Sequence, residues 1–308
     1  MSTDEGNYDV VIVGGGPAGL SCAIWCADLD LKAILLERAP EFGGNLNNIF
    51  NPINNYPGIV EQSGSGLVTR FASHAMATRT TLRLNAEVSR VDPIEMVVEM
   101  SDGTRFKSPN VVFGTGVSRR RLNIPGEREF AGHGVLRSGA ESAEVVSGKT
   151  VAVVGGGDAA LENVVMLSQN ADRVYLIHRG DHFSARAEFV DAAASASNVM
   201  MFRKSRLLAI IGGDSVERIE IEDVEDGERK ILQVDHVLVR VGVEPNSSLF
   251  RDFLTTDDRG YALINELCET NVRGIYAIGD VANPVAPTII SAAGHGAIAA
   301  KAITQRRP

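Results

Sequence analysis

The stretch YDVVIVGGGPAGLSCAIWCADLDLKAILLER, residues 8–38, decides the fold of this chain. A β-branched apolar run at 10–13 leads into the turn GGGPAG. A segment with helical spacing then leads into a second apolar run, AILLE. Short apolar runs bounded by glycine turns are typical of buried strands, and a longer periodic segment is typical of a helix. The stretch therefore predicts a βαβ unit with parallel strands and a right-handed crossover.

A second copy of this unit follows as KTVAVVGGGDAALENVVMLSQNADRVYLIHR, residues 149–179. The same spacing separates the first glycine from the end of the second strand in each copy, Gly14 to Glu37 and Gly155 to His178. A glycine-rich turn alone is a weak signal. A turn that follows a strand, opens a helix and precedes a second strand is the dinucleotide-binding fingerprint. We therefore expect two dinucleotide sites.

The glycines of the first copy have separate predicted roles. Gly14 permits the tight turn, Gly16 lets backbone N–H groups approach a pyrophosphate, and Gly19 lets the helix pack close to the strand. The helix N-terminus adds partial positive charge toward the phosphates. In the second copy Ala160 takes the third glycine's place, a variation that the fingerprint allows.

The two copies differ at the end of the second strand. Glu37 ends this strand in the first copy, and a carboxylate there accepts hydrogen bonds from ribose hydroxyls and repels a 2′-phosphate. The second copy has His178 and Arg179 at this place, with Arg186 nearby, and cations suit a phosphate. We expect FAD in the first copy and a nicotinamide dinucleotide in the second, NADPH in preference to NADH.

The second copy lies inside the chain, so we expect an α/β fold of two Rossmann-like dinucleotide-binding domains, the second inserted into the first. The predicted FAD-binding domain comprises residues 1–116 and 243–308, and the predicted NAD(P)H-binding domain comprises residues 117–242. Within the inserted domain, the alternating segment 206–239 with its Asp226-Gly227 turn predicts hairpin strands.

The late segment GIYAIGD, residues 274–280, predicts a strand that ends at Asp280. We expect this carboxylate to bind the hydroxyls of the FAD ribityl chain; a turn or helix cap is the alternative for such an acid. A helix from about Thr288 would direct its N-terminus at the flavin pyrimidine and stabilise negative charge on the reduced ring.

Composition narrows the class of protein. A net charge of −9 without a basic stripe argues against nucleic-acid binding. Because no run of about 18 apolar residues occurs, we expect no membrane span. Three cysteines are too few for a disulfide scaffold, and the N-terminus lacks a signal-peptide pattern, so a cytoplasmic location is expected.

The motifs together resemble the low-molecular-weight thioredoxin reductase family of flavoproteins, over nearly the whole chain. The resemblance implies FAD, NADPH, a homodimer, and an inserted domain that rotates between electron-input and electron-output poses. The motifs that carry it are GGGPAGL (14–20), GGNL (43–46), NNYPG (54–58), TG (115–116), GGGDAALE (155–162), HR (178–179), GVEPN (242–246), GIYAIGD (274–280) and SAAG (291–294).

The resemblance also implies the binding residues. For FAD these are Gly14, Gly16, Pro17, Ala18, Gly19, Glu37, Arg38, Gly44, Asn45, Asn55, Val88, Gly116, Gly279, Asp280, Thr288 and Ile289. For the nicotinamide dinucleotide they are Gly157, Asp158, Ala159, Ala160, His178, Arg179 and Arg186.

One family feature is missing. Members carry a C-x-x-C pair just before the second copy, and counting back without gaps places Ser138 and Glu141 at the two cysteine positions. Disulfide exchange needs a thiolate, which neither residue supplies. Cys22 and Cys26 are spaced i, i+4 on one helix, too far apart for a disulfide, and Cys268 stands alone.

Several residues around this feature have two interpretations. Glu141 is a candidate acid or base near the flavin, or a surface residue on a helix, GAESAEV, that Ser138 caps. The run Arg119–Arg121 recognises an acidic protein or a phosphate, or forms a solvated face. Gly180 replaces an arginine that family members usually carry, which weakens the predicted phosphate site.

Three functions stay open. The first is an NAD(P)H-dependent FAD reductase that passes electrons to a ferredoxin- or flavodoxin-like protein, a quinone or a small molecule, and not to a thioredoxin dithiol. The second is a flavin-dependent oxidase or dehydrogenase of a small metabolite, with a vestigial nucleotide site. The third is a non-catalytic flavoprotein.

Overall fold

The computed structural model describes residues 4–61, 63–140 and 144–306. The chain divides into two compact units, a first unit of Met1–Ser118 with Glu244–Pro308, and a second unit of Arg119–Val243. The connections between them run through two short strands, β9 (Val117–Arg119) and β17 (Val243–Pro245), which form a two-stranded sheet. In the described part of the chain, no helix combines the length and apolar character that a membrane crossing requires.

The first unit is built on a five-stranded sheet in which all pairings are parallel. The predicted βαβ unit is confirmed, because Val10–Val13 and Ala33–Leu36 pair in parallel with α1 (Pro17–Asp28) between them. The strand order reverses between β2 and β8, which makes the switch point at which doubly wound sheets bind ligands. The order across the sheet is β18 (Ile275–Ala277), β8 (Val111–Phe113), β2 (Val10–Val13), β3 (Ala33–Leu36), β4 (Thr81–Arg83).

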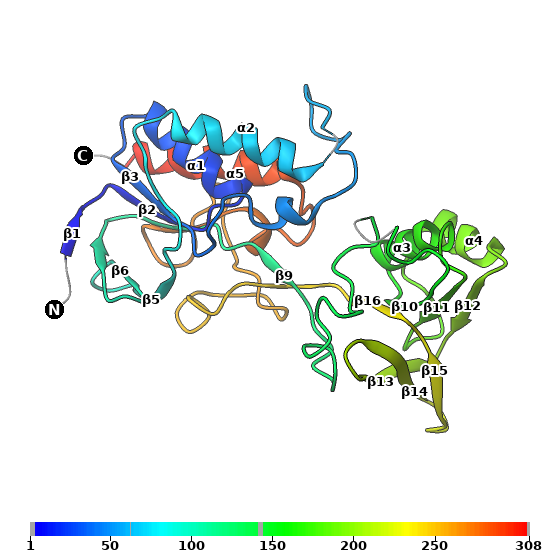
Figure 1. The fold of residues 1–308 in the computed structure, drawn as a ribbon. Coiled ribbons are helices and arrows are strands. Elements are labelled where there is room, and N and C mark those ends of the chain that lie inside the picture. The colour runs from blue at the N-terminus through cyan, green and yellow to red at the C-terminus, as the bar shows by residue number, and fades with distance from the viewer. Residues whose placement is uncertain (1–3, 62, 141–143, 307–308) are drawn as a thin grey trace. The chain divides into compact units, whose positions relative to one another are not determined.

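This parallel sheet is buried on both faces, as its continuous apolar strands require. Val10 and Ile12 of β2 pack toward the helices, whereas Val11 and Val13 pack toward a second, smaller sheet. The helices on the first face are α1, α2 (Gly64–Met76) and α5 (Ile289–Thr304) (Figure 1). The smaller sheet has the order β1 (Asp4–Asn7), β7 (Arg105–Lys107), β6 (Val97–Met100), β5 (Val88–Asp92).

The second unit repeats this layered arrangement. Its parallel sheet has the order β12 (Val199–Phe202), β11 (Arg173–Ile177), β10 (Thr150–Gly155), β16 (His236–Arg240), so the order again reverses beside the strand that precedes the glycine turn. Val151 and Val153 face the helices α3 (Asp158–Ser168) and α4 (Ala187–Ser195). Ala152 and Val154 face the antiparallel strands β13 (Ser205–Gly212), β14 (Val216–Asp223) and β15 (Arg229–Gln233).

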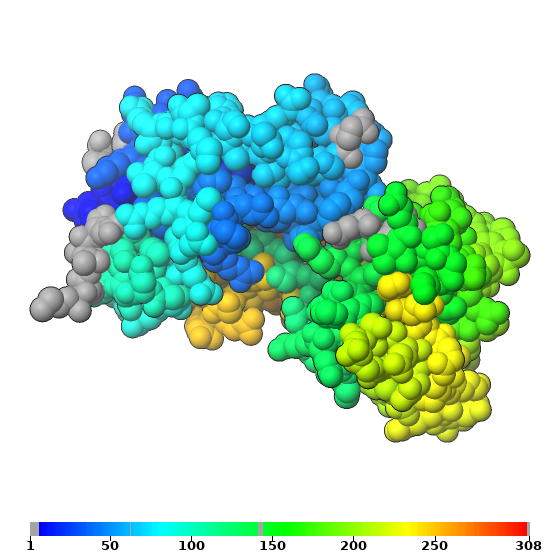
Figure 2. Space-filling view, viewed as in Figure 1, coloured from blue at the N-terminus to red at the C-terminus, as the bar shows by residue number. Residues whose placement is uncertain are grey.

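The predicted hairpins over 206–239 are confirmed for β13–β15, with the Asp226-Gly227 turn between β14 and β15. They are wrong for residues 236–239, which belong to the parallel sheet beside β10. Val237 and Leu238 are both fully buried, on opposite faces, which is the pattern of a central strand and not of a half-exposed hairpin. The outer strand β15, by contrast, is largely exposed, and its yellow residues lie at the surface in Figure 2.

Candidate dinucleotide-binding sites

The glycines of the first turn meet different neighbours. A Cβ on Gly14, whose φ is +110°, would overlap the carbonyl oxygen of Gly114 at the end of β8. A Cβ on Gly19 would overlap the carbonyl oxygen of Gly14. Gly16 has no protein atom within 4 Å of such a Cβ. Packing therefore requires glycine at the first and third positions, while the open side of Gly16 is free for a ligand.

Glu37 lies directly against this turn. Its side chain is 8 % exposed, and its carboxylate accepts hydrogen bonds from the backbone N–H groups of Gly15 at 2.6 Å and Ala39 at 2.8 Å. A Cβ on Gly15 would lie 2.7 Å from Cδ1 of Phe42. Glycine is thus also required at position 15. The three-position fingerprint does not predict this requirement, because it arises from the ring of Phe42, which is distant in sequence.

Of the other predicted flavin-side residues, Gly44 lies next to Gly16. Gly44 opens the 3₁₀-helix η1 (Gly44–Asn48), and a Cβ there would lie 3.4 Å from Cα of Gly16. The amide of Asn45 donates to the carbonyl oxygen of Val117 at 2.8 Å. Gly116 has a φ of +64° and, like Gly16, open space beside it.

The remaining predicted residues of this set differ in exposure. Pro17 and Ala18 open α1, and Ala18 is buried. The Val88 side chain lies in the core at the start of β5. Arg38 and Asn55 are exposed.

Asp280 follows β18 in a short 3₁₀ turn, η2 (Gly279–Val281). Burial raises the pKa of its half-buried carboxyl, and within the described residues no donor bonds to that carboxylate. The next helix, α5, begins at Ile289 and is capped by Thr288, whose hydroxyl accepts the Ser291 N–H at 3.3 Å. A desolvated acid without a protein donor is a group that a ligand hydroxyl would satisfy.

His295 on α5 belongs to none of the motifs quoted above. Its Nδ1 accepts the backbone N–H of Gly279 at 3.3 Å, and burial lowers its pKa. The ring therefore fixes the turn that presents Asp280.

The residues of the first unit fit FAD. The open faces at Gly16 and Gly116 leave room for a phosphate-bearing ligand beside the α1 N-terminus. The acceptor at Asp280 matches hydroxyl groups, and the buried acid Glu37 stands at the strand end that recognises a ribose.

The glycine turn of the second unit has the same backbone arrangement as that of the first unit, but different side chains surround it. A Cβ on Gly155 would overlap the carbonyl oxygen of Arg240 at the end of β16, as Gly14 meets Gly114 in the first unit. A Cβ on Gly156 would overlap the ring of His178. At Gly157 the nearest atom to such a Cβ is Oγ of Ser184, at 3.6 Å. Gly157 is the second fingerprint position, equivalent to Gly16, and a methyl group there would make only an ordinary van der Waals contact.

His178 occupies the place that Glu37 has in the first unit. Its Nε2 lies 2.9 Å from the carbonyl oxygen of His182, and its ring packs 5.0 Å from that of Phe183. Ala160 is buried beneath the turn and Ala159 is exposed on the first turn of α3.

Arg186, a predicted phosphate ligand, is held by carboxylates of its own chain. Its Nε donates to Asp158 at 2.8 Å, its backbone N–H donates to the same carboxylate at 2.7 Å, and its Nη1 donates to Glu188 at 2.8 Å. The hydrogen bond from the Arg186 N–H lowers the pKa of Asp158, which keeps that acid charged. Arg179 is exposed beside the strand end and makes none of these contacts.

The three cysteines all belong to the core cluster between the first unit's sheet and its helices. Each is a buried free thiol. A hydrogen bond with Cys26, followed by burial, raises the pKa of Cys22, and burial raises that of Cys268 to about 12. Raised values oppose thiolate formation, and thiolates are the reactive species.

The segment at the expected cysteine-pair position is only partly described. Residues 139–140 and 144–148 form turns, so the helix expected there is wrong over these residues, and within the described part of this segment Ser138 caps no helix. The Gly139 N–H instead bonds to Oδ1 of Asn163 on α3 at 3.0 Å, which draws the chain into a turn. Glu141, the predicted acid or base, lies outside the described residues.

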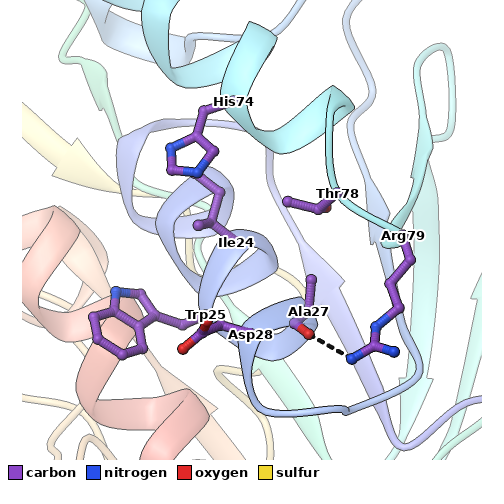
Figure 3. A pocket seen from close by; sticks show the side chains of 7 residues that line it. All are labelled: Ile24, Trp25, Ala27, Asp28, His74, Thr78 and Arg79. Atoms are coloured by element: carbon purple, nitrogen blue, oxygen red, sulfur yellow. Dashed lines mark hydrogen bonds between the residues drawn. The ribbon is translucent and has the colours of Figure 1, made fainter.

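A separate pocket of about 540 Å³ lies on the first unit, between the C-terminal part of α1 and the end of α2 (Figure 3). Trp25 and His74 line it, and Arg79, also in its lining, donates to the carbonyl oxygen of Ala27 at 2.8 Å. None of the predicted binding residues lines it.

Two Rossmann-like units, each with a glycine turn at its switch point, define a dinucleotide-dependent oxidoreductase architecture. The chain matches the model of the pyridine nucleotide-disulphide oxidoreductase family over residues 8–297 and belongs to that family, whose members generally bind FAD and NAD(P)H. Within it the chain is of the low-molecular-weight thioredoxin reductase type, and it has no C-x-x-C pair.

Relatives and solved structures agree with this assignment. The chain is 31% identical to a thioredoxin reductase of Listeria monocytogenes, over 97% of this chain and 93% of the relative. It is 30% identical to a 34.2 kDa protein in the rubredoxin operon of Clostridium pasteurianum, over 96% of each. The structure of Lactococcus lactis thioredoxin reductase in its FR conformation superposes with a TM-score of 0.84 and 29% identity, covering 97% of this chain and 98% of that one.

Proposed function

We propose that this protein is an FAD-dependent NAD(P)H oxidoreductase that delivers electrons to an acceptor other than a thioredoxin-type dithiol. The observation that carries the proposal is the combination of two glycine turns, each at the switch point of a parallel sheet, with three cysteines that are all buried in one core cluster. FAD, when bound, would supply the two-electron chemistry between nucleotide and acceptor. The first unit would hold FAD and the second the nucleotide.

The residues of the first unit would have separate roles in binding FAD. The α1 N-terminus and Gly16 would bind the FAD pyrophosphate, because the backbone there is open and the helix dipole favours anions. Glu37 would orient the ribose and Asp280 the ribityl hydroxyls. The capped N-terminus of α5 at Thr288 would favour the anionic reduced ring.

The second unit would bind the nucleotide at Gly157 and the α3 N-terminus. Arg179 would be the cation for a 2′-phosphate, since Arg186 is bound to Asp158 and Glu188. A single arginine contact to the 2′-phosphate would then give the preference for NADPH over NADH.

The proposal also includes the oligomeric state of the protein and its location in the cell. The family resemblance supports a cytoplasmic homodimer. Light scattering coupled to size-exclusion chromatography tests the dimer, which would elute at twice the chain's 32.9 kDa.

The Arg186 ion pairs also favour a second candidate. If the nucleotide site is vestigial, the protein would be a flavin-dependent oxidase or dehydrogenase of a small metabolite. Anaerobic mixing of the purified protein with NADPH and with NADH separates the two. Rapid bleaching of the flavin band supports the reductase, and bleaching only by a metabolite supports the alternative.

A further inference from the structure

Arg203 follows the edge strand of the second unit's parallel sheet. It comes directly after β12, whose neighbour β11 leads into His178 and Arg179. Because these strands are parallel, their carboxyl ends lie at one edge of the sheet, which is the edge that binds ligands in doubly wound folds. The backbone N–H of His178 donates to the carbonyl oxygen of Phe202 at 2.8 Å, so Arg203 and His178 are neighbours across the two strand ends.

An aromatic ring holds the side chain of Arg203 in place. Its guanidinium carbon lies 4.9 Å from the centre of the Phe183 ring, within the range of a cation–π contact. The ring of His178 lies 5.0 Å from that of Phe183 on the same side of the sheet. The three side chains therefore form a continuous row at the end of β11, and the contact positions the guanidinium without pairing its charge with an acid.

The other cations near this row are already paired with acids of the same chain. Nζ of Lys204 lies 2.8 Å from the carboxylate of Glu225, and Nε of Arg186 lies 2.8 Å from that of Asp158. Arg203 is exposed, and among the residues that the structure describes no carboxylate forms an ion pair with it. Its guanidinium therefore has donors available for an anionic ligand.

Gly180 leaves the place next to Arg203 without a side chain. The backbone N–H of Lys204 donates to the carbonyl oxygen of Gly180 at 3.0 Å, so the segment that carries Arg203 lies against the segment that carries Arg179. A Cβ on Gly180 would lie 3.0 Å from Nε2 of His178, which is closer than most such contacts. The strand-end row of rings thus disfavours a side chain at position 180, and the nearest guanidinium on the adjacent strand end is that of Arg203.

The end of the second strand of a Rossmann unit recognises the ribose of the dinucleotide, and an arginine nearby accommodates a 2′-phosphate. We propose that Arg203 is a specificity-determining residue that binds the 2′-phosphate of NADPH together with Arg179. The inference rests on the function proposed above, which assigns the nucleotide to the second unit. The preference for NADPH then comes from two arginine contacts, one from each of two adjacent strand ends, and no longer from Arg179 alone.

Steady-state kinetics of the purified holoprotein test the assignment, with ferricyanide as the acceptor. NADPH reduces two ferricyanide ions to ferrocyanide, giving NADP⁺ and one proton. We expect Arg203→Gln to lower kcat/KM for NADPH about tenfold and to leave kcat/KM for NADH unchanged, as loss of one charge-assisted hydrogen bond implies. Arg203→Lys keeps the positive charge and should retain part of the preference. Lys204→Gln removes the adjacent positive charge, which is paired with Glu225, and should leave both values near those of wild type.

A binding measurement tests the same contact without any turnover. The holoprotein is titrated calorimetrically with adenosine 2′,5′-bisphosphate and, separately, with adenosine 5′-monophosphate, which lacks the 2′-phosphate. We expect the wild type to bind the bisphosphate more tightly than the monophosphate. Arg203→Gln should weaken binding of the bisphosphate about tenfold and leave binding of the monophosphate unchanged. Thermal melting and flavin content of each variant show that the fold is intact.

Other outcomes would overturn the inference. Equal losses with NADPH and NADH in Arg203→Gln, or no loss with either, remove the 2′-phosphate contact. The same loss with NADPH in Lys204→Gln assigns the effect to the general field of the cations. A wild type that binds the bisphosphate no more tightly than the monophosphate has no 2′-phosphate site. If neither nucleotide bleaches the flavin while binding of the bisphosphate still depends on Arg203, the proposed function fails and the binding residue stands.

Discussion

The carboxylate of Glu37 accepts the backbone N–H of Gly15 at 2.6 Å, across the first glycine turn. His178 lies at the matching place in the second unit, where its ring takes the space that a Cβ on Gly156 would need, but it makes no such hydrogen bond among those of the described residues and lies instead 2.9 Å from the carbonyl oxygen of His182. The two units thus use one backbone plan, with an acid at the strand end in one and an imidazole in the other. This exchange is the structural difference on which the proposal of two different dinucleotides rests.

The glycine turn offers a matched pair of variants. Gly16→Ala places a methyl group in open space, so we expect a thermal midpoint near that of wild-type apoprotein and a large loss of flavin affinity. Gly19→Ala forces a clash with the Gly14 carbonyl, so the fold itself should be destabilised by several kcal/mol. Flavin content and apoprotein melting curves measure both. Equal flavin affinity in Gly16→Ala and wild type would contradict the assignment of this face to FAD.

The raised pKa of Asp280 predicts the direction in which the stability of the apoprotein changes with pH. Its carboxyl has a raised pKa in the folded protein, so the folded apoprotein binds the proton more tightly than the unfolded chain does. This group therefore lowers the stability of the fold as the pH rises from the ordinary aspartate pKa of 3.8 through the raised pKa of the folded protein. Asp280→Asn should remove that pH dependence, measured by denaturant unfolding of apoprotein, and should weaken flavin binding. If the stability of the Asp280→Asn apoprotein depended on pH as the wild type does, this would contradict the description of Asp280 as a buried acid without a partner.

The two arginines near the second turn should differ in nucleotide selectivity. Arg179→Gln should lower kcat/KM for NADPH about tenfold and leave NADH unchanged, because it removes one charge-assisted contact to the 2′-phosphate. Arg186→Gln should affect both nucleotides alike, because its partners are Asp158 and Glu188. Steady-state kinetics with both nucleotides checks this. Loss of NADPH selectivity in the Arg186 variant alone would show that its ion pairs open for the ligand.

The cysteines should be dispensable for turnover. The triple variant Cys22→Ala, Cys26→Ala, Cys268→Ala should reduce ferricyanide with NADPH at the wild-type rate, while losing about 1 kcal/mol of stability per buried thiol. Single variants serve as controls for packing. A folded triple variant without NADPH-driven turnover would place a thiol in the electron route.

The repeated unit made most of the fold predictable. Val10–Val13 and Val151–Val154 precede glycine turns, and local periodicity alone identifies both βαβ units. The prediction for residues 236–239 is wrong, because a short apolar run does not indicate which strands will lie beside it in the fold.

The candidate sites were predictable only in part. Motif spacing names Gly16, Glu37 and Asp280, but not Gly15, whose constraint comes from Phe42 through the fold. The pairing of Arg186 with Asp158 likewise depends on a loop geometry that no motif encodes. The contact of Arg203 with Phe183 joins residues from two separate segments, so only the tertiary structure reveals it.

The route of the electrons can be tested in one anaerobic experiment. Purified yellow protein is mixed with NADPH, and the reduced flavin is then offered either oxidised thioredoxin or ferricyanide in a stopped-flow instrument. We expect rapid bleaching by the nucleotide, rapid recovery of the flavin band with ferricyanide, and no recovery with thioredoxin disulfide. Recovery with thioredoxin as fast as with ferricyanide, or a colourless protein that binds no added FAD, would contradict it.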